Sequence, residues 1–172
     1  MASCNICQII EGTLPSKKVY EDDEVAAFLD YNGALEGHVL IAPKEHFPIF
    51  EQVPDKIVGH LFNTANRISS ALFDGLNIQG TNIFVTNGVS AGQKVPHFLV
   101  NVVPRKEGDG INLASQPRQL SEEEMSTTEI RIKEETRHIG IEKESAVKQQ
   151  EERVRPVDTD NYLWKSVNKK IA

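Results

Sequence analysis

Residues 97–103 read His-Phe-Leu-Val-Asn-Val-Val, and Pro104-Arg105 follows directly. Successive side chains of a β-strand point to opposite faces of the sheet, so an alternating pattern separates a core face from the other face. The stretch therefore predicts a strand that Pro104 closes, because proline has no N–H group to offer to the ladder. The apolar side chains of the core face are Phe98, Val100 and Val102, and the opposite face carries His97, Leu99 and Asn101.

The elements outside this strand indicate the fold class. Between Pro54 and Gly75 apolar residues recur at steps of three and four, which predicts one amphipathic helix of about twenty residues. Further strands are predicted over residues 25–30, 38–42 and 82–86. Several strands with one long helix predict an α+β domain whose sheet is mostly antiparallel.

Aromatic and charged residues divide the chain of 172 residues into two parts. Residues 1–110 contain all seven phenylalanines and 21 charged residues, whereas residues 111–172 contain 23 charged residues in 62 positions. Because only the first part can bury a sizeable core, we expect a domain at 1–110 and a charged C-terminal extension at 111–172. In the extension, Ser121-Glu-Glu-Glu124 fits a capping box and predicts a helix start. Residues 128–133 instead alternate like a strand, and Gly140 would interrupt a long helix, so both alternatives stay open.

Charge and hydropathy exclude several classes of protein. The net charge of −6 argues against a general nucleic-acid-binding protein and against a polybasic membrane anchor. No apolar run approaches the roughly 18 residues that span a bilayer. The N-terminus lacks a basic and then apolar signal pattern, so the expected compartment is the cytoplasm. In that compartment Cys4 and Cys7, three residues apart, suggest a metal or redox pair before a structural disulfide.

Short motifs spread over residues 4–105 resemble, in the family's order, those of the histidine triad (HIT) nucleotide-binding proteins. The family's signature strand reads His-φ-His-φ-His-φ-φ, and here Leu99 and Asn101 replace the second and third histidines. The resemblance implies a HIT-like fold for the α+β domain. The motifs are Cys4-x-x-Cys7, Val19–Asp23, Ala27–Asp30, Gly37-His38, Pro43–His46, Asn87-Gly88, Ala91–Gln93, Val95–His97 and Pro104-Arg105.

The replaced histidines bear on catalysis. In active family members the middle histidine attacks the α-phosphate and carries a nucleotidyl-imidazole intermediate, but a leucine has no lone pair with which to attack. Asn101 can hydrogen-bond a phosphate oxygen but cannot shuttle a proton near neutral pH. His38 and His46 belong to other family positions, and His60 and His138 are interpreted as surface residues. The sequence therefore predicts that the catalytic site is lost.

The first triad histidine has a second role in some family members, which bind zinc through it. The resemblance implies zinc ligands at Cys4, Cys7, His46 and His97. Two thiolates and two imidazoles form a closed tetrahedral set, which is typical of structural rather than catalytic zinc. The alternatives are a free Cys-x-x-Cys thiol pair and ordinary buried cysteines.

The resemblance also implies a nucleotide site. Phe28 and Asp30 match the positions that contact base and ribose, and Asn101 can reach a phosphate oxygen. The positions that approach the phosphates are Asn87, Gly92 and Gln93, with Lys94 in the same loop. Turn and capping chemistry is the alternative for Asp30 and Asn87, since both follow predicted strands. A purine nucleotide is the expected ligand, and family members generally pair into homodimers across a continuous sheet.

Three functions follow from these interpretations. The first is a catalytically degenerate HIT-like protein that binds a nucleotide or nucleotide-like ligand on a zinc-stapled domain. The second is a weak phosphohydrolase in which another group of the pocket carries the chemistry. Its substrates would be nucleoside phosphoramidates or dinucleoside polyphosphates. The third is an interaction scaffold whose working part is the charged extension, because one fold hosts many functions.

Overall fold

The computed structural model describes residues 4–113 and 116–139. The chain divides into two units between Leu113 and Ala114. The first unit holds a sheet with two α-helices, and the second holds one α-helix in its described part. Within the described residues no helix combines the length and the apolar composition needed to cross a membrane.

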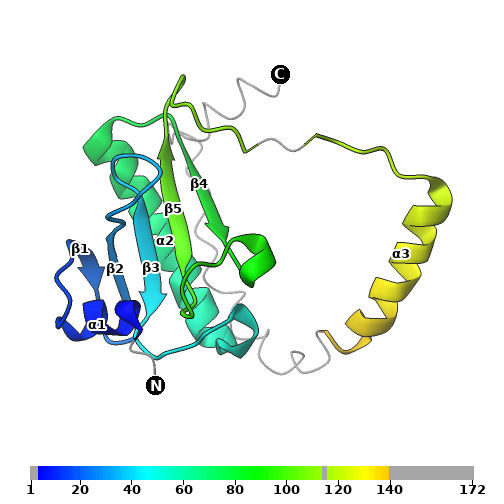
Figure 1. Ribbon diagram of the computed structural model, residues 1–172, viewed down its shortest axis with the longest axis horizontal. Helices are drawn as coiled ribbons and strands as arrows, with labels where there is room; N and C mark the ends of the chain where they lie inside the picture. The colour runs from blue at the N-terminus through cyan, green and yellow to red at the C-terminus, as the bar shows by residue number, and fades with distance from the viewer. Residues whose placement is uncertain (1–3, 114–115, 140–172) are drawn as a thin grey trace, which may run out of the picture. The chain divides into compact units, whose positions relative to one another are not determined.

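Five strands form one antiparallel sheet in the order β1-β2-β3-β5-β4 (Figure 1). β5 lies between β3 and β4. The edge strands of the sheet are therefore β1 and β4. The mixed composition of sheet and helices confirms the predicted α+β class with an antiparallel sheet. The strands are β1 (Lys18–Glu21), β2 (Val25–Leu29), β3 (Val39–Pro43), β4 (Gly80–Val85) and β5 (Val100–Arg105).

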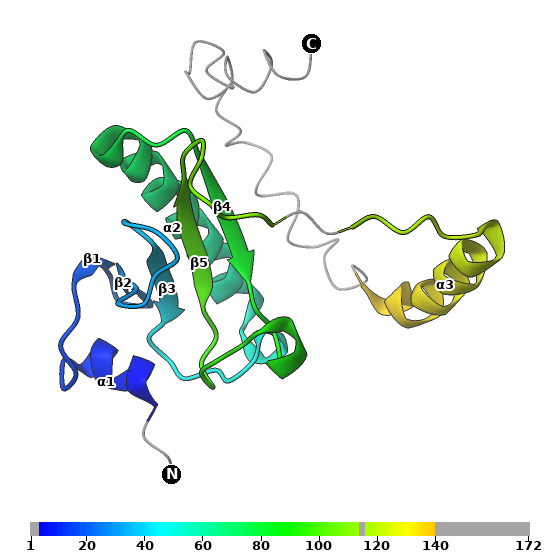
Figure 2. The same cartoon turned by 45° about the horizontal axis from the view of Figure 1, so that its top comes forward.

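Helix α2 (Asp55–Leu76) packs across one face of the sheet and forms the main core with it (Figures 1 and 2). The helix begins after Pro54 and ends at Asn77, whose left-handed backbone stops it. The predicted helix is thus confirmed to within a residue or so at each end. Buried side chains recur on α2 at the expected spacing, and they face the alternate residues of the strands. The core includes Val25, Ala27, Val39, Ile41, Leu61, Ala65, Ile68, Leu72, Phe98, Val100 and Val102.

The short helix α1 (Asn5–Glu11) covers part of the opposite face of the sheet (Figure 2). Ile6 is buried with Phe28 and Ala42, and Leu99 packs against this second cluster. Helix α1 was not predicted, because seven residues are too few for a helical repeat to be recognised. Strand β1 was not predicted either, since all four of its residues are exposed and show no alternation of burial.

The position of β5 corrects the predicted strand at 97–103. The strand begins only at Val100, because the Phe98 N–H donates to the Phe47 carbonyl at 2.6 Å instead of joining the ladder. Pro104 does not close it, since the strand continues through Arg105 and pairs Pro104 with Thr81 of β4. This is tolerated because pairing with β3 already ends at residue 102, so the missing N–H of Pro104 costs no ladder bond on that side.

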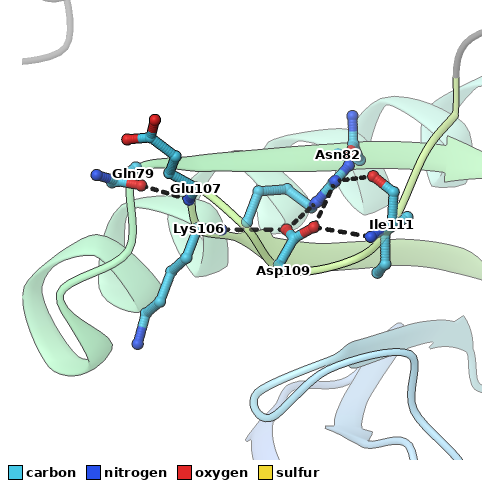
Figure 3. A network of polar contacts seen from close by, with 7 residues as sticks. Gln79, Asn82, Lys106, Glu107, Asp109 and Ile111 are labelled. Atoms are coloured by element: carbon cyan, nitrogen blue, oxygen red, sulfur yellow. Dashed lines mark hydrogen bonds and ion pairs between the residues drawn. The ribbon is translucent and has the colours of Figure 1, made fainter.

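A network of polar contacts around Asp109 fastens the loop that follows β5 (Figure 3). The Arg105 guanidinium donates to Asp109 Oδ2 at 2.6 Å and to Oδ1 at 2.9 Å, and also to the Asn82 side chain on β4. The Asp109 carboxylate in turn accepts the N–H groups of Lys106 at 3.2 Å and Ile111 at 2.9 Å. The Asp109 carboxylate therefore fixes the loop to Arg105 at the end of β5.

In the second unit, residues Glu122–Glu135 form helix α3. Ser121 caps it, accepting from the Glu124 N–H while the Glu124 side chain accepts from the Ser121 N–H. The helix start predicted from the capping box is confirmed, and the alternative strand over residues 128–133 is wrong. Local helix propensity and capping outweigh a short alternation that no partner strand supports. Gly140 lies outside the described residues.

Candidate functional site

Four potential metal ligands converge beside the first turn of α1. Their ligand atoms all lie within 4.8 Å of one another. His97 Nδ1 lies 3.5 Å from Cys4 Sγ and 3.6 Å from Cys7 Sγ. His46 Nδ1 lies 3.2 Å from Cys7 Sγ and 3.2 Å from His97 Nδ1. Residues separated by up to 93 positions thus meet at one point.

These separations fit a tetrahedral metal. With Zn–S near 2.3 Å and Zn–N near 2.05 Å, a tetrahedron has edges of about 3.6 Å between S and N and about 3.3 Å between two N atoms. The measured S···N separations of 3.2–3.6 Å and the N···N separation of 3.2 Å lie close to those edges. Neither cysteine is in a disulfide, so both thiols are available as ligands. The residues therefore fit zinc in donor type, number and spacing.

The imidazole of His97 is oriented for such a role. Its Nε2 lies 3.0 Å from the Pro43 carbonyl, which can only accept, so Nε2 carries the proton and the Nδ1 lone pair faces the cluster. Burial lowers the pKa of His97, which favours the neutral ring that a metal needs. Burial, and next the neighbouring Cys4 thiol, raise the pKa of Cys7 to about 11, so metal binding would have to displace its proton.

The signature stretch presents no imidazole at its middle position. Leu99, one residue before β5, is half-buried against the cluster under α1, and Asn101 lies on the face of β5 opposite the buried Val100 and Val102. Asn101 Nδ2 donates to the Phe84 carbonyl at 3.4 Å, and its Oδ1 lies 3.2 Å from His38 Nε2. His38 Nδ1 accepts the Ala34 N–H, so the Nε2–H of its neutral ring donates to Asn101. This His38–Asn101 contact was not foreseen, because nothing local in the sequence links residues 63 positions apart.

The residues expected to contact base and ribose lie at the end of β2. Phe28 is 1% exposed and belongs to the apolar cluster under α1, so it contributes to a wall rather than to an open stacking surface. Asp30 is partly exposed; its Oδ1 accepts the Asn32 N–H at 3.0 Å, and its Oδ2 lies 3.6 Å from His38 Nδ1. The turn chemistry considered for Asp30 is therefore present, and it leaves part of the carboxylate accessible.

The residues expected to approach a phosphate form a loop, here named the phosphate loop, over residues 87–94. Asn87 accepts the Phe50 N–H at 3.0 Å and donates to Glu51 Oε1 at 2.7 Å, a partner that the sequence did not indicate. Gln93 Oε1 accepts the Gly88 N–H at 2.8 Å, and its Nε2 donates to the carbonyls of Pro48 at 2.7 Å and Val95 at 2.9 Å. Gly92 is exposed with φ +86°, a conformation that favours glycine.

Two further histidines were interpreted as surface residues. His60 on α2 is partly exposed, and its Nε2 lies 2.7 Å from Asp22 Oδ2, which ties the turn between β1 and β2 to the helix. The side chain of His138 lies outside what the structure describes.

Comparison with known proteins relates the whole sheet to one family. The family model of the HIT domain matches residues 11–108. A HIT-like protein of Methanocaldococcus jannaschii is 41% identical over 107 residues, covering 62% of this chain and 82% of its own. An adenylylsulfatase of Arabidopsis thaliana is 39% identical over 106 residues, but the matched part spans only 54% of that relative. An adenosine 5′-monophosphoramidase of Candida albicans is 30% identical, with 83% of this chain and 97% of the relative covered.

Solved structures agree with this relationship. A Streptococcus mutans protein superimposes with a TM-score of 0.74 at 34% identity, covering 78% of this chain and 86% of its own. A zinc-bound histidine triad family protein of Mycobacterium smegmatis gives a TM-score of 0.62 at 33% identity, with coverage of 67% and 84%. The fold and the sequence motifs therefore point to the same family.

Proposed function

This chain belongs to the HIT domain family, and from that premise we propose that it binds a nucleotide or nucleotide-like ligand without hydrolysing it. The observation that carries the proposal is Leu99, which stands between His97 and Asn101 where the family's pattern has its nucleophilic histidine. The leucine packs against the cluster under α1, so it serves as an apolar contact. Covalent nucleotidyl transfer needs an activated nucleophile, and leucine provides none.

A structural zinc ion is the second part of the proposal. Cys4, Cys7, His46 and His97 would hold it, and four protein ligands leave no open position for a substrate or an activated water. The zinc in the related Mycobacterium smegmatis structure supports this assignment. The ion would supply a cross-link between the start of α1 and the sheet, and no step of a reaction would depend on it.

The proposed ligand site is the part of the face opposite α2 that α1 leaves uncovered. Asp30 would bond the ribose hydroxyls, Phe28 would shape the wall beside the base, and Asn101 would lie toward the phosphate. Two relatives carry names that describe action on adenylyl compounds, which supports a purine nucleotide as the ligand class. Asn87, Gly92 and Gln93 would form the boundary of the site at the phosphate loop.

A homodimer is proposed through the edge of the sheet. β4 has β5 on one side only, and its residues Ile83 and Phe84 are 40% and 36% exposed. An edge strand with exposed apolar side chains is a ready template for pairing with another strand. Two copies joined at β4 would continue the sheet across the dimer.

One observation keeps a weak hydrolase as the second candidate. His38 places an imidazole 3.2 Å from Asn101, on the side where the family's third histidine would stand. Its Nε2–H is donated to Asn101 and its Nδ1 accepts from Ala34, so neither ring nitrogen offers a lone pair to a phosphorus atom. We therefore rank this candidate below binding without turnover.

Calorimetry with the purified chain of 172 residues tests the proposal directly. Titration with AMP should give a dissociation constant in the micromolar range or weaker, and chromatography of the same samples should show the nucleotide unchanged. The affinity is expected to be modest because two imidazoles that contact phosphate in the family are replaced, and each lost contact costs about 1–3 kcal/mol. Absence of binding at millimolar nucleotide would instead favour the interaction scaffold.

A further inference from the structure

The phosphate loop already uses most of its polar groups to hold its own shape. The backbone N–H groups of Ala91 and Gln93 donate to the Gly88 carbonyl, and that of Gly92 donates to Val89. The Gly88 N–H donates to the Gln93 side chain. Both amide hydrogens of Gln93 also have carbonyl partners, so this side chain has no donor left for a ligand.

The groups that remain are neutral. Asn87 donates one amide hydrogen to Glu51, and Asn101 donates one to the Phe84 carbonyl, so each amide keeps at most one further N–H. One or two neutral donors suffice for a hydroxyl or an ester oxygen. They bring no positive charge to balance a phosphate monoester, which carries about −1.5 to −2 at pH 7.

The charges around the loop do not favour an anion either. Lys94 is the one cation in residues 87–94, and it is exposed. Glu51 brings a negative charge to the same place. Its carboxylate is 2.7 Å from the Asn87 amide, where the resemblance expects phosphate to approach. The chain as a whole carries −6. A ligand anion at this loop would therefore meet more repulsion, from the fixed Glu51 carboxylate and the net negative charge, than attraction from the exposed Lys94.

At the end of the face where the ribose is expected, a charged side chain does match the ligand. Asp30 keeps a partly exposed carboxylate, of which one oxygen accepts the Asn32 N–H and the other lies 3.6 Å from His38. A carboxylate has about four lone-pair sites, so it can still accept from two hydroxyl groups. Ribose hydroxyls thus have a matching charged acceptor, whereas a terminal phosphate has no matching charged donor that is buried or fixed.

We propose that this face takes an uncharged nucleoside in preference to its 5′-monophosphate. The proposal rests on the proposed function, because it uses the same site, and it narrows the ligand class. Leu99 supports it, since an apolar side chain borders the place where the phosphate of a nucleotide would be desolvated. The contact between Glu51 and Asn87 is then part of the specificity, because it places a negative charge at the 5′ end of the ligand.

The test is isothermal titration calorimetry of the zinc-loaded full chain with adenosine and with AMP, each at low and at high salt. Adenosine should bind more tightly than AMP at low salt. Because salt screens repulsion between like charges, the AMP affinity should rise as salt is added while the adenosine affinity stays constant. Attraction to a cationic phosphate site would give the opposite sign, a fall in AMP affinity with added salt.

Charge variants identify the source of the discrimination. Glu51→Gln keeps an oxygen that can accept from Asn87, and it should strengthen AMP binding by about two- to fivefold without changing adenosine binding. Asp74→Asn is the matched control, because it removes one charge from an exposed position near the C-terminal end of α2, the helix that covers the other face of the sheet. Glu51 lies just before the start of α2, and the 22 residues of the helix span about 33 Å, so the control should change neither affinity.

The outcomes separate this proposal from the one it rests on. AMP binding tighter than adenosine binding, with an affinity that falls as salt is added, would overturn the nucleoside preference and leave nucleotide binding standing. No binding of either ligand at millimolar concentration would overturn both. Adenosine binding tighter than AMP binding, with the Glu51→Gln effect confined to AMP, would support the preference, and equal affinities at low salt would overturn it.

Discussion

Replacing Cys7 by serine is expected to release α1 from the sheet while the rest of the first unit stays folded. The helix has seven residues, and ordering their backbone costs about 7–14 kcal/mol. Against this cost, α1 buries Ile6 fully and Ile9 and Ile10 in part, which contributes about 3–6 kcal/mol. A helix this short is not stable by itself. The balance requires a further stabilising contribution, and the proposed zinc ion would supply one of sufficient size, since structural zinc contributes about 10–16 kcal/mol in zinc-finger peptides.

Hydrogen–deuterium exchange measured by mass spectrometry resolves this effect. In Cys7→Ser, and in wild-type protein treated with a chelator, peptides from residues 4–11 should lose their protection. Peptides from α2 should keep theirs, because the cluster under α1 is separate from the main core. The melting temperature should fall by about 10 °C or more if α1 contributes 2 kcal/mol or more to the folded state. Glu11→Gln, on the same helix but outside the ligand set, is the control and should behave like wild type.

Two results would refute this reasoning. The first is protection of residues 4–11 that is the same with and without chelator, which would mean that α1 is held by packing alone. The second is metal analysis of protein purified without chelators that finds no zinc. Either result would return Cys4 and Cys7 to the alternative interpretation of a free thiol pair.

Further changes probe the other parts of the account. Leu99→His together with Asn101→His should recover some turnover of adenosine 5′-phosphoramidate, whereas each single change recovers little, because residues acting as a unit are non-additive; product chromatography measures this. Asp109→Asn should lower the melting temperature at pH 7, because the Arg105 guanidinium holds the pKa of the Asp109 carboxyl well below its usual range. Stability from a lowered carboxyl pKa is present above the unfolded value near 4 and is lost as the pH falls from there through the lowered folded-state pKa, so the two melting temperatures should begin to converge below about pH 4. Ile83→Lys at the β4 edge should give a monomer in sedimentation velocity if wild type sediments as a dimer.

The sequence predicted those elements whose side chains repeat with a clear period. The long helix and the strand at β2 were predicted to within about a residue, because burial on one face imposes a regular pattern. The start of β5 was wrong by three residues, since Phe98 follows the alternation of a strand but bonds to Phe47 outside the ladder. A pattern of side chains records burial, and it does not record which backbone group accepts the hydrogen bond.

The candidate site shows the same limit. The four residues of the Cys/His cluster were identified from motif positions, and the structure brings their ligand atoms together. The contacts that decide what the ligand face can bind were not predictable, because they join residues far apart in the chain. Neither the bond from Asn87 to Glu51 nor that from His38 to Asn101 leaves any local signal in the sequence. Such contacts depend on how β3, β5 and the phosphate loop pack.

The most direct test of the central claim is to follow wild-type protein with adenosine 5′-phosphoramidate by intact-protein mass spectrometry and by product chromatography. We expect ligand binding, no protein species heavier by one nucleotidyl group, and no release of AMP above background, because residue 99 is leucine. Robust hydrolysis that persists in Leu99→Ala would contradict the account, since it would show that another residue of this chain performs the chemistry.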